Sequence, residues 1–274
     1  MFAAEGPGVR LEATRHHPGD SDDRSTWTLT GTKPWCSLAD RLDAALVTAH
    51  LPEGGRGLFA VALRQDGVRL VDQPWASRGL AEIPSTPVSF DAAPAVPVGA
   101  PGWYLDRPGF WWGGIGVAAC WFGGAVAVAR RVLEAATSRP DDVLLAMHLG
   151  ALDERLEAAR LVLADAATAV DGLGTAQSID AAADASDGSG GPDGAVRDQA
   201  APGQAAPDQA APDQAVLDGP VLAKRVRATV ARTCEDVLRI AGHALGPAPL
   251  ALEPEHAKRV ADLQVYVRQQ HAER

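Results

Sequence analysis

The sequence predicts an α+β fold in which an antiparallel β-barrel-like domain, at about residues 1–103, precedes a four-helix bundle at about residues 104–274. Up to about residue 100, short apolar or alternating segments recur roughly every ten residues between Gly, Pro and Asp clusters, the pattern of a small barrel or sandwich. From about residue 108 onward, apolar residues follow a helical period over four long segments, which indicates a helical bundle.

Six strands are expected between turn-forming residues, at 9–13, 27–30, 43–50, 57–63, 67–71 and 87–90. We also expect a tight turn at Gly31 and, after it, a strand that carries Trp35 and Ser37. Because side chains alternate along a strand, these two would share one face. An indole plane beside a hydroxyl suits a flat heteroaromatic ring, since the indole covers its face and the hydroxyl bonds its edge.

The helices of the bundle are expected at about 110–137, 141–170, 218–245 and 254–274. The first contains an apolar stretch, 110–129, that is long enough to span a membrane. Its five glycines favour a buried bundle helix, because small residues let helices approach closely. Residues 174–216 are rich in Ala, Asp, Gly, Gln and Pro and contain a repeated Gln-Ala-Ala-Pro motif. Such a composition predicts a disordered loop.

The chain is acidic, with a net charge of −10 and a pI of about 5.1. This argues against nucleic acid as a partner and, more weakly, against an anionic membrane surface. The three cysteines are far apart and show no CxxC spacing, so neither a disulfide framework nor a metal site is expected. The first residues lack the pattern of a signal peptide, and we expect a cytoplasmic location.

The segment Thr28-Leu-Thr-Gly-Thr-Lys-Pro-Trp-Cys-Ser37 resembles the G-x-K-x-W-[IC]-[ST] motif of the acyl-CoA dehydrogenase superfamily. Further blocks resemble the same family in the same order: 75–80, 85–91 and 96–99 its β domain, and 114–131 and 148–160 its first two bundle helices. The resemblance implies that Trp35 packs on the ring of FAD and that Ser37 reaches its reactive nitrogen. It also implies an acyl-CoA substrate, a homo- or hetero-oligomer, and an electron-transfer flavoprotein as a possible partner.

The chain departs from the family in three places. The family begins with an all-helical domain that this sequence lacks, and Glu5-Gly6-Pro7-Gly8 only partly resembles its Gly-Ser-Asp loop beside the flavin. The family's catalytic Glu falls on Gly113 or, in the last helix, on Val267 or Arg268, and none of these is a carboxylate. Proton abstraction next to a thioester needs a positioned base, so the catalytic residue is unassigned. Nearby acids, which we expect on solvated helix faces, are Glu255, Asp262 and Glu273.

Arg139 lies near the position at which the family places an Arg on the FAD pyrophosphate of a neighbouring subunit, a role that suits a guanidinium. The alternative is that Arg139 compensates the dipole at the end of the first helix. His271 resembles the C-terminal His of hydroxylase-type relatives, with an exposed surface His as the alternative. Three functions follow: an FAD-dependent acyl-CoA oxidoreductase of lipid or secondary metabolism, a non-catalytic partner subunit of such an enzyme, and a flavin-dependent monooxygenase.

Overall fold

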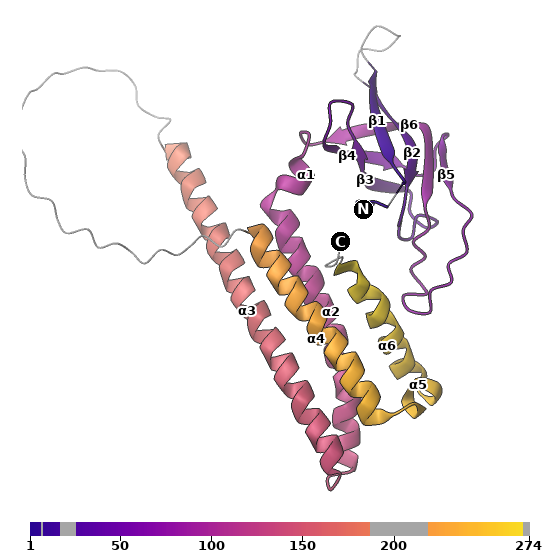
Figure 1. The fold of residues 1–274 in the computed structure, drawn as a ribbon. Coiled ribbons are helices and arrows are strands. Elements are labelled where there is room, and N and C mark those ends of the chain that lie inside the picture. Colours follow the sequence, from indigo (N-terminus) through magenta and orange to yellow (C-terminus); the bar gives the residue numbers. More distant parts are fainter. Residues whose placement is uncertain (7, 17–25, 187–218, 271–274) are drawn as a thin grey trace, which may run out of the picture.

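The computed structural model describes residues 1–6, 8–16, 26–186 and 219–270. Within them, a β domain lies at one end of a set of long helices (Figure 1), so the α+β prediction is confirmed. The strands are β1 (Leu11–His16), β2 (Thr26–Lys33), β3 (Ala44–His50), β4 (Arg56–Ala62), β5 (Val68–Leu70) and β6 (Val88–Val98).

The strands form a closed five-stranded barrel. Their order is β2-β1-β3-β4-β6-β5, and an additional β2–β6 pairing joins the ends of the first five strands, which leaves β5 attached to β6. All pairings are antiparallel except β1 with β3, which is parallel and departs from the antiparallel prediction. Alternation turns one side of each strand inward, and the barrel core includes fully buried Leu29, Val47 and Phe59.

The turn predicted at Gly31 is wrong. β2 continues through this position to Lys33, with a shift in its register against β6 between Leu29 and Gly31. Gly31 has a φ of 122°, and a Cβ atom on it would lie 2.2 Å from the carbonyl oxygen of Arg10. Glycine is therefore needed for a bulge and a close approach of two strands rather than for a chain reversal.

The helical part begins directly after the barrel. Its elements are α1 (Trp103–Asp106), α2 (Pro108–Ser138), α3 (Val143–Ser186), α4 (Gly219–Leu245), α5 (Ala248–Leu252), α6 (Pro254–Val267) and the 3₁₀ turn η1 (Arg268–Gln270). The expected four long helices are present, but α3 runs about four turns beyond its predicted end near residue 170. The rest of the predicted insertion, residues 187–216, lies outside the described residues.

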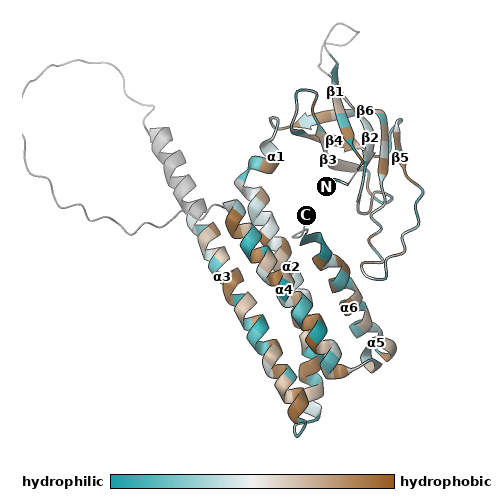
Figure 2. Ribbon diagram, in the orientation of Figure 1, coloured by the Kyte–Doolittle hydropathy of each residue, from teal (hydrophilic) through white to brown (hydrophobic). Residues whose placement is uncertain are grey.

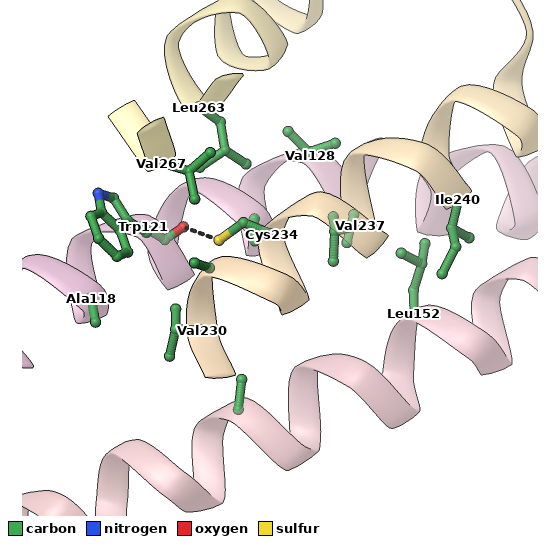
Figure 3. Packing of buried hydrophobic residues seen from close by; sticks show 14 of the residues in the cluster. Ala118, Trp121, Val128, Leu152, Val230, Cys234, Val237, Ile240, Leu263 and Val267 are labelled. Carbon is green, nitrogen blue, oxygen red and sulfur yellow. Dashed lines mark hydrogen bonds between the residues drawn. The ribbon is translucent and has the colours of Figure 1, made fainter. Parts of the chain in front are cut away.

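The bundle core is made by the facing sides of α2, α3, α4 and α6. Figure 3 shows Trp121, Cys234 and Leu263 close together from α2, α4 and α6, and Leu152 of α3 beside Ile240 of α4 further along the bundle. By length and composition α2 is the one helix in the described ranges apolar enough to cross a membrane, and a third of its most apolar window is buried. In this structure it is a bundle helix, as the sequence favours.

A loop from the barrel docks on α6 and connects the two parts. Gly79 packs so closely that a Cβ atom would lie 2.0 Å from the carbonyl oxygen of Ala261. The backbone N–H of Leu80 donates a 2.7 Å hydrogen bond to Asp262 Oδ1, and Lys258 forms an ion pair with Glu82 at 3.0 Å. This contact helps to fix the barrel relative to α6.

Candidate functional site

The turn after β2 carries both residues that the sequence assigns to a flavin. The predicted strand at this place is wrong: β2 ends at Lys33, Pro34 follows, and Trp35 and Leu38 adopt left-handed backbone conformations with φ of 58° and 59°. Proline cannot donate to a strand ladder, and a left-handed residue ends the extended run. Strained conformations of this kind persist where the surrounding structure imposes them, and they concentrate at functional sites.

Hydrogen bonds attach this turn to residues 84–86, which precede β6. The N–H of Cys36 donates to the carbonyl of Thr86 at 3.2 Å, and the N–H of Leu38 donates to that of Pro84 at 2.8 Å. The hydroxyls of Ser37 and Ser85 lie 2.7 Å apart and share a hydrogen bond. The turn is therefore held on both sides of Ser37.

The turn presents an indole and a hydroxyl to its surroundings and hides its thiol. Trp35 is 58% exposed although it is a large apolar side chain, and Ser37 is exposed. Cys36, between them, is fully buried, and burial raises the pKa of its thiol to about 12. A thiol in that state is neither a nucleophile nor a redox group at neutral pH. Trp35 and Ser37 are thus the groups that this turn offers to a ligand.

The N-terminal segment lies against the same turn. A Cβ atom on Gly6 would lie 3.3 Å from Cγ of Pro34. The neighbouring Glu5 carboxylate accepts hydrogen bonds from Lys33 Nζ at 2.8 Å and His50 Nε2 at 3.1 Å. Glu5 therefore anchors the N-terminal segment to the barrel beside Trp35, a role that the sequence pattern does not reveal.

The ion pair of Glu5 and Lys33 is partly removed from solvent. Lys33 is 1% exposed, and its Nζ also donates to Thr48 Oγ1 at 2.9 Å. Partial burial raises the pKa of Glu5, but the hydrogen bond and charge of Lys33, with help from His50 and Arg56, outweigh it and hold that pKa below 4.5. Burial lowers the pKa of Lys33 despite the opposing effect of Glu5. The sequence signal for this buried ion pair was Lys33 itself, a charged residue inside the G-x-K-x-W motif at an inward position of β2.

The positions where the family carries its catalytic Glu hold no carboxylate in this chain. Gly113 lies on an exposed side of α2, where a Cβ atom would have no neighbour within 4 Å, and Val267 is buried at the end of α6. Arg268 opens η1 and is paired with Glu235 of α4. None of the three can remove a proton from a carbon acid.

The nearby acids have other partners. Asp262 binds the Leu80 N–H and Lys258, so it is part of the contact between the barrel and α6. Glu255 is 85% exposed and pairs with Arg259 at 3.2 Å, as expected for a solvated face. The remaining candidates, Glu273 and His271, lie outside the described residues. In the described ranges, no group of three or more His, Cys, Asp or Glu could hold a metal ion.

Arg139 lies far from the Trp35 turn. It follows α2, whose 31 residues extend for about 45 Å away from the barrel (Figure 1). Its guanidinium is 3.4 Å from the carboxylate of Asp142, and that carboxylate accepts a hydrogen bond from the N–H of Leu145 at the start of α3. Within one chain, Arg139 and Trp35 cannot contact the same small ligand.

A second polar cluster, which the sequence pattern does not predict, lies where α2, α4 and η1 meet. Arg227 of α4 donates to the carbonyls of Gly114 and Gln269, both at 3.1 Å, and its guanidinium stacks 4.6 Å above the Trp121 ring. The Trp121 indole N–H is buried without a hydrogen-bond acceptor among the described residues. A charged residue directly after the buried Val226 of an amphipathic helix was the signal for this cluster.

Comparisons with known proteins identify the fold. Neither a protein-family model nor a curated protein matches the sequence. Solved structures do match: a probable acyl-CoA dehydrogenase from Mycobacterium abscessus has a TM-score of 0.65 and 14% identity, over 96% of this chain and 61% of that one. A glutaryl-coenzyme A dehydrogenase in complex with glutaryl-CoA has a TM-score of 0.66 and 17% identity, over 93% and 56%.

A third similar structure contains a bound flavin. KijD3, in complex with FMN and a dTDP-linked amino-keto sugar, has a TM-score of 0.64 and 16% identity, over 98% of this chain and 59% of that one. The chain thus spans about three fifths of the length of these structures. The chain has the acyl-CoA dehydrogenase fold, represented by its β barrel and helical bundle.

Proposed function

We propose that this chain is a flavin-binding, acyl-CoA dehydrogenase-like oxidoreductase subunit, with FAD as its cofactor and an acyl-CoA thioester as its substrate. One observation carries the proposal: in the acyl-CoA dehydrogenase fold, Trp35 and Ser37 are both exposed on one turn that is fixed to residues 84–86. An exposed indole gives a planar ring an apolar surface, and a hydroxyl bonds a ring edge. These residues fit a flavin.

A bound flavin would supply two-electron acceptor chemistry, and the protein would supply its position and surroundings. Trp35 would cover one face of the ring, and Ser37 would bond its edge. Ser37 shares one hydrogen bond with Ser85. Because a hydroxyl has one donor and two acceptor sites, Ser37 can bond the ligand while Ser85 holds the turn. The buried Cys36 would not compete for the substrate, because its thiol stays protonated.

The missing carboxylate favours a second candidate, a non-catalytic partner subunit of a heteromeric dehydrogenase. Gly113, Val267 and Arg268 cannot act as the base that an acyl-CoA dehydrogenase needs. In this candidate the chain binds flavin or stabilises the complex while another chain carries the base. Co-purification with a chain that has the Glu would support it, and dehydrogenation by the isolated chain would exclude it.

The similarity to KijD3 with bound FMN favours a third candidate, a flavin-dependent monooxygenase. Such a reaction uses reduced flavin and oxygen and does not need the dehydrogenase Glu. Oxygen uptake that depends on a flavin reductase, NADH and a candidate substrate would distinguish it from the first candidate.

Assembly and location complete the proposal. The chain would act in the cytoplasm as a homo- or hetero-oligomer and, as a dehydrogenase, would pass electrons to an electron-transfer flavoprotein. Arg139 would bind the FAD pyrophosphate of a neighbouring copy, since it lies at the end of α2 remote from its own Trp35.

The first experiment is the visible absorption spectrum of the purified protein, before and after FAD or FMN is added and unbound flavin is removed. A stoichiometric oxidised-flavin spectrum supports the proposed cofactor, and the preferred flavin distinguishes FAD from FMN. Turnover with acyl-CoA and an artificial acceptor then tests the dehydrogenase. A protein that takes up neither flavin, alone or with a partner subunit, would refute the proposed cofactor site.

A further inference from the structure

The loop of residues 71–87, which joins β5 to β6, contacts both the Trp35 turn and the helical bundle. Its last part, residues 84–86, carries the groups that hydrogen-bond the Trp35 turn. Its middle part, at Gly79 and Leu80, lies against α6. One loop therefore connects the turn that would hold a flavin with the last long helix of the bundle.

The contact of this loop with α6 is specific. Leu80 has a left-handed φ of 51°, a conformation that bulky residues rarely adopt. Its N–H donates a 2.7 Å hydrogen bond to Asp262 Oδ1, and the carboxylate makes this bond charge-assisted. The Asp262 side chain is 28% exposed, so water competes for it only in part. Asp262 thus holds the loop at a residue whose backbone is strained.

Short contacts lead from Leu80 to Ser37. The carbonyl of Leu80 accepts a 3.0 Å hydrogen bond from the N–H of Ile83, which closes a turn. The carbonyl of Ile83 accepts a 3.2 Å hydrogen bond from Ser85 Oγ, and that oxygen lies 2.7 Å from Ser37 Oγ. Residues 84–86 are therefore held on one side by the part of the loop that is docked on α6, and on the other by β6.

We propose that Asp262 of α6 is a positioning residue for the Trp35 turn. By fixing Leu80 it fixes residues 84–86, and these in turn set the placement of Trp35 and Ser37. The value of this placement for a ligand rests on the flavin site proposed above, whereas the placement itself does not. The bundle then contributes to a site whose ligand-facing side chains all come from the barrel.

Hydrogen exchange of the full chain without ligand, measured by NMR, tests the placement. The reporters are the amides of Cys36 and Leu38, which donate to the carbonyls of Thr86 and Pro84. Asp262→Ala removes the acceptor but favours the helix of α6. Because a charge-assisted bond is lost, we expect the two amides to exchange about tenfold faster relative to the amides of the β3–β4 ladder.

Two further variants separate this role from general destabilisation. Asp262→Asn retains a side-chain carbonyl that can accept the Leu80 N–H, so it should restore most of the protection. Glu255→Gln is the matched control, because it removes another ion pair within α6, the one with Arg259 at 3.2 Å. It should leave the exchange of both reporter amides unchanged.

Four results would overturn the role of Asp262. They are unchanged reporter amides in Asp262→Ala, equal acceleration of the β3–β4 amides, no rescue by Asp262→Asn, and the same effect in Glu255→Gln. The exchange measurements use no flavin, so this role and the proposed cofactor site fail separately.

Fluorescence titration with FAD connects the placement with function. Asp262→Ala should bind FAD at least about threefold more weakly, because its site is less preorganised, and Glu255→Gln should bind it as the wild type does. A wild type that binds FAD no better than Asp262→Ala would overturn the contribution of Asp262 to binding.

Discussion

At the residue scale, Trp35 combines a large apolar side chain with 58% exposure and a left-handed backbone. Because its indole buries little surface, we expect Trp35→Ala to change the melting temperature by no more than a few degrees. Loss of an aromatic stacking surface should weaken flavin binding roughly tenfold to a hundredfold. Fluorescence titration with FAD measures the affinity. Trp103→Ala removes another exposed indole, at 45%, and serves as the control; equal flavin affinity in Trp35→Ala and wild type would contradict the assignment.

The Glu5–Lys33 pair has a structural role that pH should reveal. The folded-state pKa of Glu5 lies below 4.5, so its contribution to stability is present above the unfolded-state pKa and is lost as pH falls through the folded-state value. Glu5→Gln leaves Lys33 buried without its carboxylate and should reduce stability at pH 7 by about 1–3 kcal/mol. The difference between wild type and variant in urea denaturation should shrink below pH 4.5. Glu12→Gln, whose carboxylate is 63% exposed, is the control, and a pH-independent difference would argue against this role.

The role of a residue could be predicted from the sequence where it depends on that residue and its immediate neighbours. It could not be predicted where it depends on contacts between distant segments. The exposure of Trp35 and Ser37 agrees with a ligand-binding turn, whereas their roles toward flavin remain predictions. The contact of Glu5 with Lys33 joins residues 28 positions apart, so the local pattern marks Lys33 but does not identify its partner. In the same way, the helical pattern marks Arg227 but not the carbonyls of Gly114 and Gln269 that it binds.

At the element scale, hydrophobic period predicted the type of each long element better than its ends. α2 agrees closely with its predicted extent, because Pro108 lies in its first turn and Pro140 follows its end, and a proline cannot continue a helix. α3 continues past its predicted end near residue 170 because the glycines that follow, Gly172 and Gly174, lie inside the helix, where a glycine costs only about 1 kcal/mol. The turn predicted at Gly31 is wrong for a related reason. Glycine is favoured both in tight turns and in bulges, so the residue alone does not distinguish the two.

The loop that joins the barrel to α6 provides an element-scale prediction. Gly79→Ala would place its Cβ against the backbone carbonyl of Ala261, which cannot rotate away as a side chain can. We expect a loss of about 1–3 kcal/mol and faster tryptic cleavage after the exposed Arg78. Gly242→Ala, in α4 with nothing within 4 Å of a new Cβ, should instead stabilise slightly, since alanine favours a helix. Unchanged melting and proteolysis of Gly79→Ala would show that the loop does not need this contact.

At the scale of the whole molecule, the bundle leaves an apolar surface uncovered. A groove of about 780 Å³ runs between α2 and α3, lined by apolar residues together with Arg130, Thr137 and Asp153. Figure 2 shows hydrophobic residues at the end of the bundle where α2 and α3 meet. Leu133 and Met147, on these helices, are 49% and 58% exposed. Exposed apolar patches of this kind mark interaction sites.

We predict that a second copy of the chain covers this surface. The groove, its apolar rim and charges of both signs all lie on α2 and α3, so the surface can be complementary to itself. A two-fold interface uses one patch twice, and Arg130 of one copy would then be available to Asp153 of the other. We expect the protein to elute above its monomer mass of 28.5 kDa in size-exclusion chromatography with light scattering. Introducing charge with Leu133→Glu and Met147→Glu together should yield monomers with an unchanged circular dichroism spectrum.

Leu252→Glu is the matched control for this experiment, since Leu252 is 78% exposed but lies on α5, away from the groove. It should leave the mass of the assembly unchanged. Flavin binding of the monomeric variant then tests whether Arg139 of one copy serves the site of another, because only an assembled protein can bring Arg139 near a Trp35 turn. A monomeric wild type, or a double variant that stays assembled, would exclude the α2–α3 surface as the interface between copies.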